Sequence, residues 1–258
     1  MLTATIEGIG FWAAGLPTWA AAHAFATGRG GIVDTPPRPA SQLLAPNERR
    51  RAPDTVAVSL EVALAACQDA GHDPATLPSI FTSTHGDVAI TDYMCTTLAS
   101  DPLAISPTKF HNSVHNAAAG YWTIGAGATA AATAISAHRA SFAQGLLEAL
   151  SQLAAGEAAV LLAAYDSRST GPLARVSQSD SLLGAALVLG AAALPGKPRL
   201  RVRLADGDAA AGDGALARHA AGNAMAPMLV LFDALAAGAA GCTLDAGGGR
   251  CLHVELQT

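Results

Sequence analysis

Two histidines stand four residues apart, at His111 and His115. On a helix this spacing would put both imidazoles on one face, as in a pair of zinc ligands. The glutamate of the HExxH motif is absent, however, and the sequence indicates no third ligand. We therefore expect structural histidines, or histidines that line a pocket, and neither a metal ion nor a cofactor.

His138 and Ser141 form a second pair that could do chemistry, as the base and the nucleophile of acyl hydrolysis or transfer. No G-x-S-x-G elbow surrounds Ser141, and neither an orienting acid nor an oxyanion hole can be named. A hydrolase or transferase that uses these two residues is therefore only an alternative hypothesis.

The glycine-rich segment from Gly125 to Ala130 matches the loosest form of the dinucleotide-binding fingerprint. That motif requires a strand before it and a helix after it. Here the preceding residues have a helical pattern and the following residues an extended one. We expect a turn of small residues rather than a phosphate-binding loop.

Predicted helices and strands alternate along the chain, and they must position these residues. A capped helix is expected over residues 53–71, and a helix over 141–155 lies between the apolar strands 132–136 and 158–164, as in a βαβ unit. The pattern predicts an α/β domain with helices around a largely buried sheet. The other predicted elements are strands 3–9, 79–83, 183–189, 200–204 and 251–256, helices 16–25, 90–98, 112–124 and 225–237, and a linker over 209–221.

The composition excludes several classes of protein. Apolar residues make up 51% and charged residues 14%, which excludes a disordered chain and favours buried strands or a large subunit interface. A net charge of −5, with one short basic run at Arg49 to Arg51, argues against nucleic acid as a partner. The uncharged segments 116–137 and 181–196 are rich in small residues or too short to span a bilayer, so no membrane span is expected.

Cysteine spacing and the N-terminus bear on the compartment. The four cysteines form no CxxC pair, and no export signal is recognisable at the N-terminus. Cys242 and Cys251 flank a glycine-rich turn and could face each other across a hairpin, but two unpaired thiols are favoured. We expect a reduced, cytoplasmic protein.

The stretch from Ser106 to Ala164 resembles the β-ketoacyl synthases of the thiolase superfamily. The segment that begins Ser106-Pro and ends Asn116-Ala-Ala-Ala-Gly is similar to their S-P … N-x-x-A-G segment, and Gly156-Glu-Ala-Ala-Val is similar to their G-E/D-A-D-V strand. A gap-free count between these landmarks places the nucleophilic cysteine of the family at Arg139, and no cysteine lies nearby. The two histidine motifs of the family's second half, H-G-T-G-T and N-x-x-G-H, are also absent.

The resemblance implies a thiolase-like layered fold, with helices around a mixed β-sheet and a shortened C-terminal half. Residues 1–258 would form a single ketosynthase-like domain, with an N-terminal half over 1–205 and a reduced half over 206–258. Within the family, the chain most resembles chain-length-factor-type proteins that lack the catalytic cysteine, as in aryl polyene and xanthomonadin-type pigment clusters. Such a protein would be a non-catalytic subunit that pairs with an active ketosynthase in fatty acid or polyketide biosynthesis and meets an acyl carrier protein through that complex.

The resemblance also implies where the partner and the acyl chain lie. The strand that contains Ile135 and Ser136 would pair across the two-fold axis of the dimer, and Phe110 would help to set the chain length. Arg139 would need an acidic partner, an exit to water or a role at the interface, because burial of an unpaired guanidinium costs several kcal/mol. The other residues expected at the pocket or interface are Lys109, His111, His115 and Asn116.

Three alternatives to this subunit stay open. The chain could be a scaffold that has no influence on chain length. It could be a thiolase-fold hydrolase or transferase that uses His138 and Ser141. It could also be a free acyl-binding homodimer, which needs only the pocket.

Overall fold

The computed structural model describes residues 1–257, and one mixed β-sheet runs through them. The strands lie in the order β3-β2-β4-β5-β1-β6-β8-β7. β3, β2 and β4 are parallel, and every other neighbouring pair is antiparallel. The strands are β1 (Leu2–Ala13), β2 (Ser79–Thr82), β3 (Ala132–Ile135), β4 (Ala159–Asp166), β5 (Leu183–Gly190), β6 (Arg199–Asp206), β7 (Gly241–Gly247) and β8 (Arg250–Gln257).

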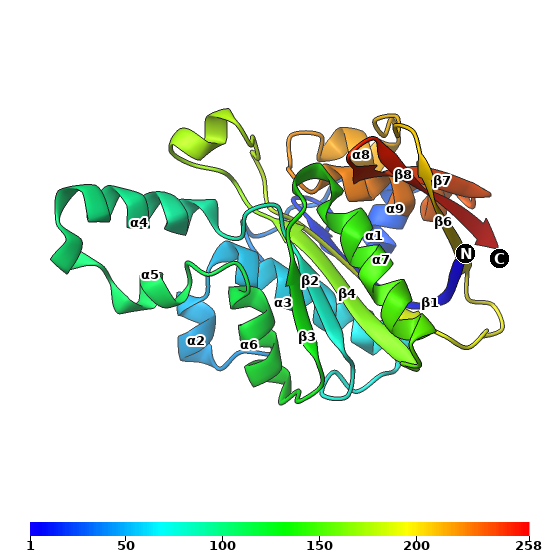
Figure 1. Ribbon diagram of the computed structural model, residues 1–258, viewed down its shortest axis with the longest axis horizontal. Coiled ribbons are helices and arrows are strands. Elements are labelled where there is room, and N and C mark those ends of the chain that lie inside the picture. Colours follow the sequence, from blue (N-terminus) through cyan, green and yellow to red (C-terminus); the bar gives the residue numbers. More distant parts are fainter. Residues whose placement is uncertain (258) are drawn as a thin grey trace.

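Helices cover both faces of the central strands (Figure 1). β4 illustrates the arrangement, because Val160 and Leu162 enter one hydrophobic cluster while Leu161 and Tyr165 enter the other. Burial on both faces explains the unbroken apolar run of this strand. The helices are α1 (Trp19–Ala26), α2 (Pro46–Arg51), α3 (Asp54–Ala70), α4 (Val88–Ser100), α5 (Pro107–His111), α6 (Ala117–Ala126), α7 (Ser141–Ala154), α8 (Ala215–His219) and α9 (Leu229–Ala237).

The packing of α3 on β1 depends on two glycines. A Cβ atom at Gly10 would lie 1.9 Å from the carbonyl oxygen of Val62, and one at Gly8 would lie 2.2 Å from that of Ala66. Only residues without a side chain allow the helix backbone to approach the strand so closely. These glycines therefore place α3 directly against the sheet.

The fold has a projecting arm and a free sheet edge. α4 and α5 project from the body as an arm, joined by the short 3₁₀ helix Pro102–Ala104 (Figure 1). β3 is the edge strand of the sheet and is bonded on one side only, to β2. Both chain termini lie at the end of the molecule opposite the arm, near β6 and β8.

Most expected elements are present, including α3, the turn around Gly127 and the β3-α7-β4 unit. The expected helix over 112–124 is wrong in its first part, because α5 ends before Asn112 and α6 begins at Ala117. The expected linker over 209–221 contains α8, whose first amides donate to the Asp233 carboxylate at 2.9 and 3.0 Å. The strand β7, which pairs with β8, was not predicted.

The cysteines agree with the expectation of unpaired thiols. In the hairpin, Cys242 lies opposite Val254 and Cys251 opposite Asp245, so the two sulfur atoms do not face each other. All four cysteines are free. In the part of the chain that the structure describes, no helix has both the length and the apolar character needed to cross a membrane.

Candidate functional site

A strained turn joins β3 to α7. His138 has a φ of 51°, and it is the one non-glycine residue with a positive φ among residues 1–257. A side chain in this left-handed region costs conformational energy, and such residues cluster at functional sites. The Ser141 hydroxyl supports the turn, because it accepts from the Ala137 amide at 2.9 Å and donates to the His138 carbonyl at 2.7 Å.

A cavity of about 330 Å³ opens beside this turn, and we call it the turn cavity. Four segments that are distant in the sequence form its wall: the end of β2, the turn itself, the loop after β4 and the loop after α8. Its lining is mostly polar. The lining residues are Thr84, His138, Arg139, Arg175, Val176, Ser177, Gln178, Ala221, Gly222, Asn223 and Ala224.

A buried carboxylate at the end of β4 holds the end of β2 in place. Asp166 accepts from the Ser83 hydroxyl at 2.6 Å, from the Thr84 hydroxyl at 2.7 Å and from the Thr84 amide at 3.1 and 3.2 Å. Burial raises the pKa of Asp166 to about 6, although these hydrogen bonds oppose the shift. Asn223 donates to the Asp166 carbonyl at 3.2 Å, so the same point anchors the loop after α8.

Three histidines surround the turn, and they come from three segments. The rings of His85 and His138 meet edge to face, with centroids 6.5 Å apart, and the His115 ring lies 2.9 Å from the Ser83 carbonyl oxygen. Partial burial lowers the pKa of His85, and repulsion from His138 and His115 lowers it further. Among the described residues no group of side chains is arranged to hold a metal ion, and His111 and His115 do not share a helix.

Arg139 is exposed at the mouth of the turn cavity. In residues 1–257 its guanidinium forms no ion pair and has the expected exit to water, while its expected role at an interface stays a prediction. On its other side Arg139 lines a smaller cavity of about 180 Å³, which also contains Asp245. The strained residue is His138, one position before Arg139; which of the two replaces the family's cysteine stays a prediction.

The geometry around Ser141 does not suit a serine nucleophile. The side chain is fully buried, and its hydroxyl is bonded to two backbone groups, whereas His138 is exposed. The His138 imidazole therefore has no hydrogen bond to the hydroxyl that it would have to activate. The alternative that pairs His138 with Ser141 lacks the geometry it requires.

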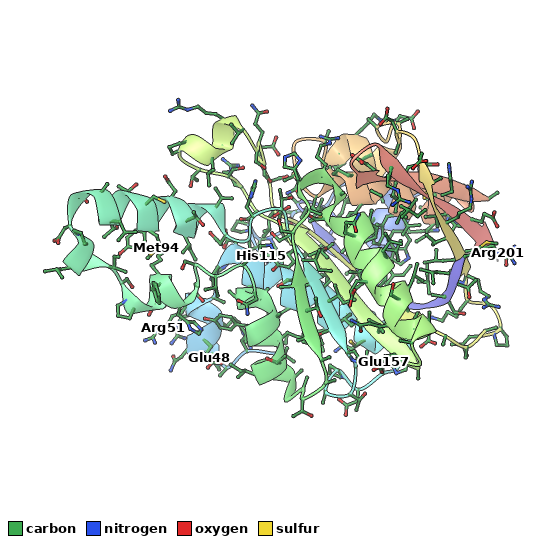
Figure 2. All side chains as sticks on the ribbon, viewed as in Figure 1. Glu48, Arg51, Met94, His115, Glu157 and Arg201 are labelled. Carbon is green, nitrogen blue, oxygen red and sulfur yellow. The ribbon has the colours of Figure 1, made fainter. Side chains whose placement is uncertain are left out.

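The other expected residues divide between the arm and β3. Phe110, His111 and Asn116 line a more apolar pocket of about 530 Å³ between α2, α5 and α6, which we call the arm pocket. The Lys109 ammonium instead lies over the Tyr93 ring, 5.7 Å from its centroid. Figure 2 shows His115 where the arm meets the sheet, with Glu48 and Arg51, two further lining residues of the arm pocket, below α5.

β3 brings the last two expected residues to the edge of the sheet. Ile135 packs against the hydrophobic core, and the Ser136 hydroxyl donates to the Thr84 carbonyl at 2.7 Å. Ser136 therefore ties the turn to the loop that carries His85. No cysteine lines the turn cavity or the arm pocket in the described part of the chain.

Sequence reasoning missed His85, Asp166, Arg175 and Asn223. His85 carried a signal, because it lies in a Thr-His-Gly turn directly after a predicted strand. Asp166 lies two residues after the predicted strand 158–164 and is the last residue of β4. Nothing local marks Arg175 or Asn223, which reach the cavity through loops that fold back over the ends of β2 and β4.

Several solved structures share this fold over nearly the whole chain. A structure of the ketosynthase ApeO in complex with its chain length factor ApeC from Xenorhabdus doucetiae matches with a TM-score of 0.77 and 23% identity, over 99% of this chain and 100% of that one. The ishigamide ketosynthase/chain length factor matches with a TM-score of 0.70 and 15% identity, over 98% and 99% of the two chains.

A third structure is of AntDE:AntF, a type II PKS acyl-carrier protein in complex with its ketosynthase bound to the hexaketide. It matches with a TM-score of 0.75 and 12% identity, over 100% of this chain and 99% of that one. At these identities the likeness establishes the fold, which is the thiolase-like ketosynthase fold. No curated protein sequence matches significantly. A family model described as "Beta-ketoacyl synthase, N-terminal domain" matches residues 19–248, most of the chain, and this protein therefore belongs to the β-ketoacyl synthase family.

Proposed function

We propose that this chain is a non-catalytic, chain-length-factor-like subunit that forms a heterodimer with an active β-ketoacyl-[acyl carrier protein] synthase. The observation that carries the proposal is the turn before α7, where a member of this family has His138 and Arg139 and no thiol. An acyl chain can be held on the enzyme as a thioester only by a cysteine thiol. The condensation would therefore take place in the partner subunit.

The free edge of β3 supports pairing with a partner. The amides of Ser79 and Ser83 on the neighbouring strand region donate to the carbonyls of Ala131 and Ile135. Because backbone groups alternate along a strand, those of Ala132 and Ala134 point away from β2, toward the free edge. The strand is short, carries no charge and has no proline, so nothing in it prevents strand addition.

The exposed apolar side chains of the arm also support pairing with a partner. On the arm, Leu103 is 97% exposed and Phe110 63% exposed, and Leu98 is exposed as well. Val114 and Ile124 are exposed beside the arm, on the loop after α5 and on α6. Apolar side chains gathered on one projecting element indicate a contact surface. The arm pocket, lined partly by Phe110, would then lie near the partner and influence how much room the acyl chain has.

The similar structures favour this assignment. Two of those reported above are complexes of a ketosynthase and a chain length factor, and a third contains an acyl carrier protein. By analogy, the pair proposed here would act on intermediates bound to a carrier protein in polyketide or fatty acid biosynthesis. The narrower assignment to aryl polyene-type pigments rests on the sequence resemblance.

The pairing is tested by coexpression with a ketosynthase from the same gene neighbourhood, followed by size-exclusion chromatography with light scattering. We expect a one-to-one complex that condenses malonyl units only when this chain is present. Ala134→Pro should prevent assembly, because it removes an outward amide without breaking the hydrogen bonds to β2. Ala134→Ser is the matched control and should assemble. A chain that is active alone and loses turnover on His138→Ala would refute the proposal.

The influence on chain length is tested with Phe110→Ala in the assembled complex. We expect the product distribution to shift toward longer acyl chains, because the substitution enlarges the arm pocket. Leu194→Ala is the control, since Leu194 is also an exposed apolar residue but lies on the loop between β5 and β6, away from both cavities. An assembled Phe110→Ala complex with an unchanged product distribution would leave the chain as a scaffold without influence on length.

A further inference from the structure

We propose that the turn cavity binds a small oxyanion, a carboxylate or a phosphate group, through Arg139 and Arg175. This ligand site is independent of the pairing proposed above, which uses the edge of β3 and the arm. The turn cavity is polar, whereas the arm pocket is mainly apolar and suits an acyl chain.

Two arginines that lack carboxylate partners are among the lining residues of this one cavity. Arg139 comes from the turn before α7 and Arg175 from the 3₁₀ helix Pro172–Arg175 after β4. Neither forms an ion pair or a side-chain hydrogen bond within residues 1–257, although the chain as a whole is acidic. A guanidinium presents a fixed fork of N–H donors that matches the oxygens of a carboxylate or phosphate.

The nearby carboxylates do not neutralise this pair. Asp166 is buried, and both of its carboxylate oxygens accept hydrogen bonds from Ser83 and Thr84. Asp245 lines the neighbouring cavity, where its carboxylate accepts from the Gly247 amide at 2.8 Å. Asp180 lies against Gly222 on the cavity wall and forms no ion pair with either arginine. The cavity keeps a positive character that an oxyanion would offset.

The other walls allow an anion but favour no apolar ligand. His138 and Thr84 bring further polar side chains, and no side chain caps the first amides of α7, so its positive end adds to the field at the turn. The Asn223 amide donates to the backbone carbonyls of Asp166 and Ser181, so it shapes the wall and leaves ligand binding to the arginines. A volume of about 330 Å³ accommodates a phosphate or a short dicarboxylate with its water.

The test is isothermal titration with inorganic phosphate and with malonate at constant ionic strength. The chain is used alone if it purifies alone. If it purifies only with its ketosynthase, the complex is used for the wild type and for every variant. We expect saturable binding of at least one anion. Arg139→Gln and Arg175→Gln should each weaken it by about tenfold or more, because each removes a charge-assisted contact. Arg139→Lys should retain more affinity than Arg139→Gln.

Arg203→Gln is the matched control, because Arg203 is an exposed arginine on β6 that forms no ion pair. Its affinity should stay within about twofold of the wild type. Binding of phosphate alone would assign the site to a phosphate group, and binding of malonate alone to a carboxylate. The proposal fails if neither anion binds, or if Arg203→Gln weakens binding as much as Arg139→Gln does. Neither of these two failures would concern assembly of the heterodimer, so neither would bear on the proposed subunit function.

Discussion

Asp166 should make the stability of this protein depend on pH, and Asp166→Asn should remove that dependence. Burial raises the pKa of Asp166 from an ordinary value of 3.8 to about 6. The folded state therefore favours the protonated acid. The stabilisation from this group is complete below pH 3.8 and is lost as the pH rises through 6.

The magnitude follows from the two pKa values. One pKa unit corresponds to about 1.36 kcal/mol, so full ionisation of Asp166 lowers the free energy of unfolding by about 3 kcal/mol. Between pH 7.5 and pH 5.0 the wild type should recover about 1 kcal/mol of that amount. The amide side chain of the Asp166→Asn variant is neutral at both values and recovers none, although it lacks an acceptor for one of the donors on Ser83 and Thr84.

The assay is urea unfolding of the wild type and Asp166→Asn at pH 7.5 and pH 5.0. Other groups titrate in this range, but they are common to both proteins and cancel in the difference. We expect the difference to move by about 1 kcal/mol in favour of the wild type at pH 5.0. Asp206→Asn is the control, because the Asp206 side chain is 97% exposed, and its difference should stay constant. A constant difference for Asp166→Asn, or one that moves the other way, would refute the reasoning.

Three further predictions concern packing, the turn and the thiols. Gly10→Ala should lower the free energy of unfolding by several kcal/mol, because the added Cβ would clash with the α3 backbone. Gly120→Ala should raise it by up to about 1 kcal/mol, because the added Cβ on this helical residue has no atom within 4 Å. Urea unfolding measures both. Ser141→Ala should cost about 1–3 kcal/mol by leaving the Ala137 amide without its acceptor, and a loss below about 0.5 kcal/mol would contradict this. When the native protein is treated with a thiol reagent, Cys95 should react first and Cys67 last. Cys95 is exposed, whereas burial raises the pKa of the Cys67 thiol to about 12. Peptide mass spectrometry gives the order of reaction.

Much of the fold could be predicted because its signals are local. The glycine that ends α3, the apolar face of α7 and the unbroken apolar runs of β4 and β5 follow from residue types and their periodicity, which depend on neighbouring residues alone. The errors occurred where a distant residue decides the structure. α8 begins where Asp233 accepts its first amides, and the break before α6 occurs where His115 bonds to the end of β2.

The sequence by itself determined the α/β alternation, the absence of a cysteine from the turn that leads into α7, and the absence of the HExxH motif and of a dinucleotide-binding loop in its required context. The tertiary structure alone decided that β3 lies at the edge of the sheet and that Thr84, His138, Arg175 and Asn223 line one cavity. It also decided that Asp166 is buried and that the backbone strain falls on His138. The physical reason is that strand order and loop contacts arise from hydrogen bonds and packing between segments far apart in the chain, which no local pattern encodes.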